Sequence, residues 1–197
     1  MKLDAKYWEN RYLNEETGWD LGQVSAPIKN YVDQIADTDI SVLVPGAGYG
    51  YEVLYLRKKG ISNVTVVDIA QTPLKRLHQR LGDQQGYELI QQDFFSHSGS
   101  YDLILEQTFF CALEVRFRES YTQKMYELLK PGGILAGVLF DFTQQRDAPP
   151  YGGSIEEYQE LFAPKFDISR IESCRCSEPD RQGKELFIEL IKPVYEK

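Results

Sequence analysis

Three glycines at alternate positions are the first residues whose type and spacing suggest chemistry. Gly46, Gly48 and Gly50 follow residues 41–44, an uncharged, β-branched run that predicts a buried strand, and a helical pattern begins directly after them. Glycine lets the backbone approach a ligand closely, and the start of a helix offers unpaired N–H groups. The stretch therefore predicts a site for the phosphate or sugar of a nucleotide-like ligand.

A carboxylate further along the chain narrows the choice of ligand. Asp68 stands 20 residues after Gly48 and ends a second buried strand, where an acidic residue accepts hydrogen bonds from both ribose hydroxyls. The dinucleotide pattern G-x-G-x-x-G is not met, because the third glycine comes one residue early and Tyr51 takes its place. The spacing G-x-G-x-G resembles that of methyltransferases that use S-adenosylmethionine. We therefore expect this cofactor.

Two more carboxylates follow predicted strands. Asp93 ends the third strand and Glu106 lies in the fourth. Because ligands bind beyond the carboxyl ends of parallel strands, we expect both acids at the same edge as Asp68. Asp93, with the backbone and ring of Phe94, would contact adenine, and Glu106 would face the α-ammonium group of the methionine part. Each could instead be a solvated turn carboxylate.

The elements that must position these residues alternate along the chain. We therefore expect an α/β fold: a Rossmann-like, class I S-adenosylmethionine-dependent methyltransferase fold with a seven-stranded, mostly parallel sheet, an antiparallel C-terminal hairpin and helices on both faces. The expected strands lie at 41–44, 63–68, 87–95, from 101 into a loop, 134–140, 166–176 and 184–191. The expected helices lie at 4–14, 25–35, 51–59, 72–81, 119–130 and 154–162, with Ser25 able to cap the second.

Length and charge limit the domain count and the class of partner. The 197 residues fit one domain, 1–197, in which 1–35 would form a helical cap over the cofactor. Hydrophobic residues make up 42%, as expected of a compact globule, and the net charge of −8 argues against nucleic acid or an anionic membrane as partner. We expect a small-molecule methyl acceptor, no nucleic-acid or membrane partner, and a monomer or weak dimer.

The few cysteines and histidines give no sign of a metal. There are three cysteines and two histidines, and none has the spacing of a zinc site. His78 and His97 are expected to be solvated, and Cys174 and Cys176 on one strand face to be inert packing in preference to a metalloid site. Cys111 is expected to be buried beside the pocket. Free thiols, a charged N-terminus and the lack of a membrane-length apolar run favour the cytoplasm.

Several longer motifs resemble one family from end to end. They are Trp8-Glu-Asn-Arg-Tyr12, Gly18-Trp19-Asp20, Val44-Pro45-Gly46-Ala-Gly48, Thr108-Phe-Phe-Cys-Ala-Leu113, Tyr126-Glu-Leu-Leu-Lys-Pro131 and Pro149-Pro150-Tyr151. Together they resemble the thiopurine S-methyltransferase family, nearest its plant halide/thiol methyltransferase branch. The glycine motif is generic to methyltransferases, whereas the F-F-C-A-L run and the P-P-Y step are more specific.

The resemblance implies methyl transfer from S-adenosylmethionine to a soft nucleophile: a thiolate, thiocyanate, a halide or a thiopurine sulfur. The expected cofactor-contacting residues are Trp8, Tyr12, Trp19, Gly46, Ala47, Gly48, Asp68, Ile69, Asp93, Phe94 and Glu106. The two tryptophans could form a lid over the sulfonium or simply close the bottom of a core. Tyr12 stands where the plant branch has tryptophan, and Glu106-Gln107 replaces an Asp-Tyr pair, so the acceptor preference does not transfer.

The acceptor pocket has fewer signals. Tyr151 is the catalytic candidate, presenting its hydroxyl to an incoming anion, although it could instead pack under the preceding prolines. Phe109 and Phe110 would form an apolar wall or belong to the core, and Arg146 and Arg181 would attract an anion or be surface charge. In-line displacement by a soft anion needs positioning and no general base. The alternatives are methylation of oxygen, nitrogen or a metalloid, or cofactor binding without turnover.

Overall fold

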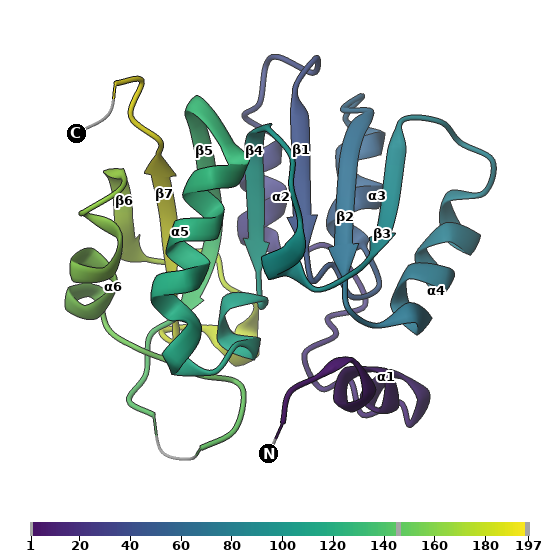
Figure 1. Ribbon diagram of the computed structural model, residues 1–197, viewed down its shortest axis with the longest axis horizontal. Coiled ribbons are helices and arrows are strands. Elements are labelled where there is room, and N and C mark those ends of the chain that lie inside the picture. Colours follow the sequence, from purple (N-terminus) through teal and green to yellow (C-terminus); the bar gives the residue numbers. More distant parts are fainter. Residues whose placement is uncertain (1, 145–146, 196–197) are drawn as a thin grey trace.

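The computed structural model describes residues 2–144 and 147–195 and contains a seven-stranded sheet in the order β3-β2-β1-β4-β5-β7-β6 (Figure 1). The strands are β1 (Ser41–Pro45), β2 (Asn63–Asp68), β3 (Tyr87–Gln91), β4 (Tyr101–Gln107), β5 (Leu129–Phe140), β6 (Asp167–Ser173) and β7 (Glu185–Ile191). β1 to β5 run parallel, and β7 is antiparallel to both of its neighbours. The predicted mostly parallel sheet with a terminal hairpin is confirmed.

Helices cover both faces of this sheet. They are α1 (Ala5–Leu13), α2 (Ala26–Val32), α3 (Tyr51–Lys58), α4 (Gln71–Leu81), α5 (Arg118–Leu128) and α6 (Ile155–Phe162), with the 3-10 turns η1 (Phe94–Ser96), η2 (Phe110–Ala112), η3 (Val115–Phe117) and η4 (Pro179–Arg181). α2, α3 and α4 share one hydrophobic core with the sheet, and α5 and α6 share the other. α1 lies beyond the carboxyl ends of the strands, at the bottom of Figure 1.

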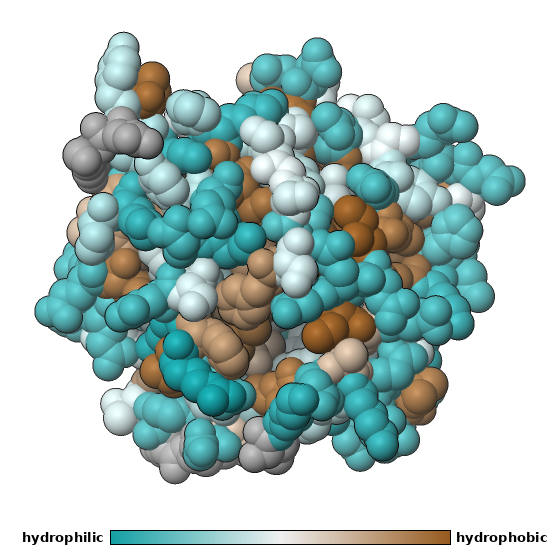
Figure 2. All heavy atoms as spheres, viewed as in Figure 1, coloured by the Kyte–Doolittle hydropathy of each residue, from teal (hydrophilic) through white to brown (hydrophobic). Residues whose placement is uncertain are grey.

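The strands are hydrophobic on both sides because each face packs against helices. In β1, Val42 and Val44 belong to the core under α2 and α3, whereas Leu43 between them belongs to the core under α5. Continuous apolar runs of this kind are what buried parallel strands require. Figure 2 shows hydrophilic side chains over most of the face seen in Figure 1, with hydrophobic side chains visible only in separate areas.

One strand begins earlier than its sequence pattern predicts. β5 starts at Leu129, not residue 134, because Leu129 pairs with Tyr101 and the pairing shifts register before Leu103. The Gly132 N–H donates to the Lys192 carbonyl at 2.8 Å, with φ of +79° at that glycine. The predicted helix stop is therefore the irregular start of a strand. Among the described residues, no helix is both long and apolar enough to cross a membrane.

Candidate active site

The turn between β1 and α3 depends on glycine. Gly46, Gly48 and Gly50 have φ values of +57°, +52° and +71°, a region that other residues rarely adopt. A Cβ on Gly46 would lie 2.4 Å from the ring of Phe109, and one on Gly50 would lie 2.5 Å from a leucine of α4. At Gly48 the nearest atom would be the Tyr12 hydroxyl oxygen at 3.3 Å. The turn is a confined cradle with Gly46, Ala47 and Gly48 half-buried.

Asp68 ends β2 beside this turn. Its carboxylate is buried, and Oδ1 accepts a hydrogen bond from the Ala70 N–H at 2.9 Å. Burial raises the pKa of Asp68 to about 6, and hydrogen bonds from the Ala70 and Gly48 backbone offset part of the rise. Ile69 follows, half-buried at the same edge. A carboxylate at this strand end is in the position that the predicted ribose contact requires.

Aromatic side chains from α1 and the next loop lie over the turn. The ring of Trp19 lies 5.6 Å from those of both Trp8 and Tyr12 in edge-to-face geometry, and Tyr12 meets Tyr49 at the same distance. The Arg11 guanidinium lies over the Trp19 ring at 5.3 Å. The structure therefore brings the three predicted cap residues together in one cluster. The lid hypothesis offers the Trp19 ring to the sulfonium of the cofactor, but the Arg11 guanidinium already lies over that ring.

Glu9 fixes α1 in this position, a role that the sequence interpretation missed. Its carboxylate accepts hydrogen bonds from the N–H groups of Gln71 at 2.8 Å and Thr72 at 3.0 Å, and from the Thr72 hydroxyl at 2.6 Å. These residues begin α4, whose N-cap residue, Ala70, offers no side-chain acceptor. Burial acts to raise the pKa of Glu9, but the bonds from Thr72 and Gln71 outweigh it and lower that pKa. The sequence did offer a signal for this contact, because an alanine at the N-cap of α4 leaves the first N–H groups of that helix in need of an acceptor from elsewhere.

Asp93 and Phe94 face different surroundings at the end of β3. Asp93 is exposed, and its Oδ1 accepts a hydrogen bond from the Phe95 N–H at 3.1 Å. The Phe94 ring is buried in the core and lies 5.0 Å from the Phe109 ring. A ring packed in this way cannot stack on adenine unless it moves. The Asp93 carboxylate and the Phe94 backbone remain the groups available for the predicted contact.

Glu106 takes a position different from the predicted one. Its side chain is 0% exposed: Oε1 accepts hydrogen bonds from the N–H groups of Phe109 at 2.8 Å and Phe110 at 2.9 Å, and Oε2 from the Tyr121 hydroxyl at 2.6 Å. Burial raises the pKa of Glu106 to about 7, and these three bonds limit the rise. Because both oxygens bond within the protein, the carboxylate holds the turn after β4 and does not face a ligand ammonium group.

The turn that Glu106 holds is strained. Thr108 has φ of +59°, which is unusual for a β-branched residue and requires support from its surroundings. The turn brings half-buried Phe109 against Gly46. Phe110 is instead buried in the core, with its ring 4.8 Å from the Tyr121 ring. It therefore packs in the core, which was the alternative prediction, and does not form a wall of the acceptor pocket.

Tyr151 follows a cis peptide bond between Pro149 and Pro150. Its N–H donates to the Cys111 carbonyl at 2.8 Å, and Cys111 is buried, as predicted. Burial, and then nearby acidic groups and the Tyr7 hydroxyl, raise the pKa of Tyr151, so its hydroxyl stays protonated and can donate a hydrogen bond. Arg146 lies outside the described residues.

Gln107 is a candidate that the sequence interpretation did not select. The Ser25 hydroxyl donates to Gln107 Oε1 at 2.6 Å and makes no capping bond to α2, contrary to prediction. The amide nitrogen, Nε2, is buried and has no hydrogen-bond partner within the described part of the chain. A buried donor without a partner costs about 1–3 kcal/mol. An acceptor atom placed beside the end of β4 would satisfy this donor.

Arg181 links the C-terminal hairpin to the aromatic cluster, although surface charge was the alternative favoured for it. From the loop between β6 and β7 it donates to the Trp19 carbonyl at 2.8 Å, and it lies 3.5 Å from the carboxylate of buried Glu185. The positive charge of Arg181 also acts on Glu52, the second residue of α3. Burial raises the pKa of the Glu52 carboxyl to about 7, and the attraction of Arg181 offsets part of that rise.

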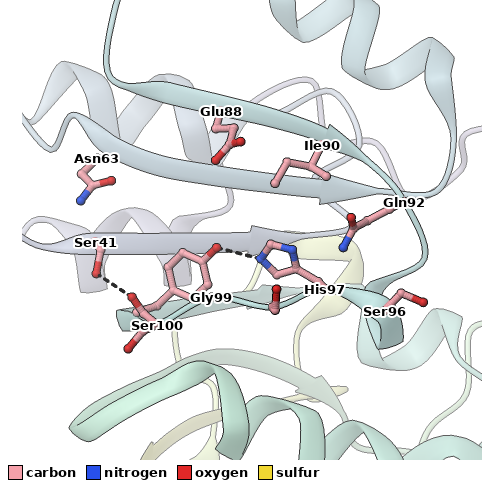
Figure 3. Close-up of a pocket in the computed structure, with 11 residues that line it drawn as sticks. Ser41, Asn63, Glu88, Ile90, Gln92, Ser96, His97, Gly99 and Ser100 are labelled. Atoms are coloured by element: carbon pink, nitrogen blue, oxygen red, sulfur yellow. Dashed lines mark hydrogen bonds between the residues drawn. The ribbon is translucent and has the colours of Figure 1, made fainter.

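The ring of each histidine lies beside a tyrosine hydroxyl. His97 is buried, contrary to prediction, and its Nε2 is 2.7 Å from the hydroxyl of Tyr101, the first residue of β4. Exposed His78 has its Nδ1 3.2 Å from the hydroxyl of Tyr87, the first residue of β3. His97 also lines a polar groove of about 480 Å³ that extends from the first residues of β1, β2 and β4 to Gln92, just after β3 (Figure 3). Each ring thus has a tyrosine hydroxyl within hydrogen-bond distance, Tyr101 for His97 and Tyr87 for His78.

The carboxyl edge fits the predicted cofactor. The glycine cradle, the buried Asp68 carboxylate and the aromatic cluster provide close backbone approach, a hydroxyl acceptor and ring surfaces for a nucleoside. The model of the thiopurine S-methyltransferase (TPMT) family matches residues 3–195. The chain belongs to the thiopurine S-methyltransferase family. The predicted family, the enzyme class of S-adenosylmethionine-dependent methyltransferase and the cofactor are thereby confirmed.

Relatives and a solved structure support this assignment. Probable thiol methyltransferase 2 of Arabidopsis thaliana is 33% identical over 162 residues, which cover 80% of this chain and 71% of that protein. Thiocyanate methyltransferase 1 of the same plant is 30% identical over 184 residues, covering 90% and 81%. The structure of 1,6-didemethyltoxoflavin-N1-methyltransferase from Burkholderia thailandensis covers 96% of this chain and 87% of its own, with TM-score 0.79 and 18% identity. This last likeness shows the fold alone.

Proposed function

We propose that this methyltransferase acts on a small, soft nucleophile: a thiol, thiocyanate, a halide or a thiopurine sulfur. The observation that carries the proposal is a pair of neutral donors in segments at the carboxyl edge, Gln107 Nε2 and the Tyr151 hydroxyl. The ring of each histidine is instead paired with a tyrosine hydroxyl. Two such donors suit a nucleophile that is already anionic, because neutral donors orient an anion without removing a proton.

The residues divide between holding the cofactor and orienting the acceptor. When bound, S-adenosylmethionine supplies a methyl group activated by a sulfonium. Asp68 accepts hydrogen bonds from the ribose hydroxyls, and the exposed Asp93 carboxylate with the Phe94 backbone recognises adenine. Tyr151 and Gln107 donate to the acceptor. The half-buried ring of Phe109 excludes water, which strips solvent from the nucleophile and favours in-line attack.

A panel of acceptors tests this proposal. The purified protein is incubated with S-adenosylmethionine carrying a labelled methyl group and with thiocyanate, iodide, a small thiol, a thiopurine, a catechol or an amine, and volatile and soluble products are measured. We expect label in products of the sulfur or halide acceptors. Label only in the catechol or amine product would contradict the acceptor class. Absence of any product, with intact cofactor binding, would favour a binding protein without turnover.

A second candidate reaction is methylation of an oxygen, nitrogen or metalloid centre. The observation that favours it is the buried carboxylate of Glu52, which lies at the start of α3 directly after the glycine turn and whose pKa burial raises to about 7. Glu106 has a similar pKa, but both of its oxygens are engaged by the turn and Tyr121. Replacement of Glu52 by glutamine should abolish catechol or amine methylation if it is the base, and should leave thiocyanate methylation intact.

We further propose that residues 1–197 act as one domain, as a monomer or weak dimer, in the cytoplasm, with residues 1–35 as its cap. The contacts of Glu9 with α4 and of Arg181 with Trp19, which tie the cap to the rest of the fold, support this organisation. The three free thiols suit a reducing compartment. Light scattering on the purified protein tests the oligomeric state, and a stable tetramer would contradict it.

A further inference from the structure

Two thiols lie side by side at the end of β6, on the far edge of the sheet from β3. The Sγ atoms of Cys174 and Cys176 are 3.9 Å apart, with Cys174 buried and Cys176 half-buried. In the sheet, β5 and β7 separate this strand from β4, whose end carries Gln107. We propose that the two cysteines form a dithiol site for a trivalent arsenical, independent of the methyl-transfer site.

The separation of the two sulfurs suits a bent centre that binds both. Two sulfurs each about 2.3 Å from one atom lie about 3.5 Å apart at the angle near 100° of a pyramidal atom with a lone pair, and a linear arrangement would need about 4.6 Å. A disulfide requires about 2.05 Å. The 3.9 Å distance between Cys174 and Cys176 therefore accommodates a shared pyramidal atom with little movement, whereas a disulfide would require the sulfurs to approach by nearly half of that distance.

The number of ligands separates arsenic from zinc. A structural zinc ion takes four protein ligands, but the described residues contain no group of three or more histidine, cysteine or acidic side chains that could hold a metal. Trivalent arsenic needs only two protein sulfurs when a carbon or hydroxyl substituent fills its third position. For phenylarsine oxide, C6H5As=O and two thiols give C6H5As(S–Cys)2 and one water. Arsenic stays trivalent, so no oxidant is needed.

A cavity of about 240 Å³ beside the sulfurs has room for the substituent. It lies between α2 and the β6–β7 hairpin, and both cysteines line it together with Tyr31 and Phe187. The two aromatic rings are 5.7 Å apart. Burial raises the pKa of the Cys174 thiol, so it starts the reaction protonated, and its proton leaves with the oxide oxygen as water when the As–S bond forms. An aryl group on arsenic would thus meet apolar rings while both sulfurs bind the metalloid.

The test uses phenylarsine oxide and the full-length, reduced protein. Native mass spectrometry with excess glutathione should show one phenylarsine bound to the wild type, removable by the dithiol 2,3-dimercaptopropanol. Cys174→Ser and Cys176→Ser should each weaken retention on the order of 100-fold, because one thiol lacks the chelate effect. Cys111→Ser, which removes the third cysteine, is the matched control and should bind like the wild type. Thermal unfolding checks that each variant is folded.

Three results would overturn the proposal. They are absence of the phenylarsine adduct in the wild type, unchanged retention of phenylarsine in Cys176→Ser, and loss of phenylarsine binding in Cys111→Ser. If Cys174→Ser fails to fold, Cys176→Ser decides alone, because that side chain is only half-buried. Zinc alone should leave the melting temperature of the wild type unchanged, and a zinc-induced rise equal to that with phenylarsine oxide would reassign the site to zinc.

Discussion

The two halves of the carboxyl edge are built in different ways. In the cofactor half, the glycine turn and Asp68 come from the ends of neighbouring strands β1 and β2. In the acceptor half, the turn after β4 depends on the fully buried Glu106 carboxylate, and Arg181 reaches from the last hairpin to the Trp19 carbonyl. The first half follows from local sequence, whereas the second needs contacts between distant segments. We therefore expect substitutions in the acceptor half to affect acceptor choice more than cofactor affinity.

The largest effect should come from the cofactor half. Asp68→Asn should raise the Kd for S-adenosylmethionine on the order of 100-fold, because it removes the charge from hydrogen bonds to the ribose hydroxyls. Titration calorimetry measures it. Asp102→Asn is the matched control at the opposite edge, where Asp102 bonds Ser41 and Lys130, and it should leave this Kd unchanged. Equal losses in the two variants would show that a carboxylate at the strand end has no special role in cofactor binding.

The next largest effect should come from the contact between Gly46 and the Phe109 ring, which joins the two halves. Gly46→Ala places a methyl group against the Phe109 ring and should lower the free energy of unfolding by about 2–4 kcal/mol, by chemical denaturation. Gly22→Ala has a similar positive φ but open space around it, so it measures the backbone cost alone, about 1 kcal/mol. Addition of Phe109→Ala should restore part of the loss in Gly46→Ala. Equal costs at the two glycines would mean that no steric coupling exists.

A smaller change should separate the acceptor half from the cofactor half. Gln107→Ala removes the unpaired amide donor and should raise the KM for thiocyanate by about tenfold or more, with the Kd for S-adenosylmethionine unchanged, because a single hydrogen bond to a charged ligand contributes about 1.5–3 kcal/mol. Steady-state kinetics and calorimetry give the two values. Gln91→Ala, at the end of β3, is the control and should change neither. A weaker cofactor affinity alone would place Gln107 in the cofactor half.

The smallest effect concerns the pH dependence of stability. Burial raises the pKa of Glu52 and Glu106 to about 7 and of Asp68 to about 6, so from about pH 4 to 7 the folded protein keeps protons that the unfolded chain has released. Their contribution to the unfolding free energy therefore falls as pH rises through this range. Glu52→Gln should make the unfolding free energy fall less steeply with pH and should raise it at pH 8 by about 1–3 kcal/mol, because the amide carries no buried charge. The exposed control Glu160→Gln should do neither, and a steeper fall in Glu52→Gln would contradict the assigned pKa.

The sequence predicts the two strand ends of the cofactor half because their signals are local. Apolar runs ending in Gly46 and in Asp68 define two strand ends, and their order along the chain fixes them at one edge of a parallel sheet. Phe94 shows where prediction from local sequence fails, because nothing in the residues around it indicates that its ring packs in the core between Phe95 and Phe109.

Most of the acceptor half could not be predicted in this way. The burial of Glu106 depends on Tyr121, 15 residues later, and on the positive φ of Thr108. The unpaired amide of Gln107 becomes visible only when its surroundings are known. His97 looks solvated in a Ser-His-Ser-Gly loop, yet Tyr101 gives it a buried partner. In each case the deciding contact comes from outside the local pattern.

The central claim is that the acceptor arrives as an anion and needs no general base. Its most direct test is the single-turnover rate of methyl transfer to thiocyanate, with saturating labelled S-adenosylmethionine, from about pH 7 to about pH 9. Thiocyanate is an anion throughout, so we predict a rate that stays constant within about a factor of two across this range. A rate that follows the titration of a single group near pH 7, or no transfer to thiocyanate while an amine or alcohol is methylated, would contradict it.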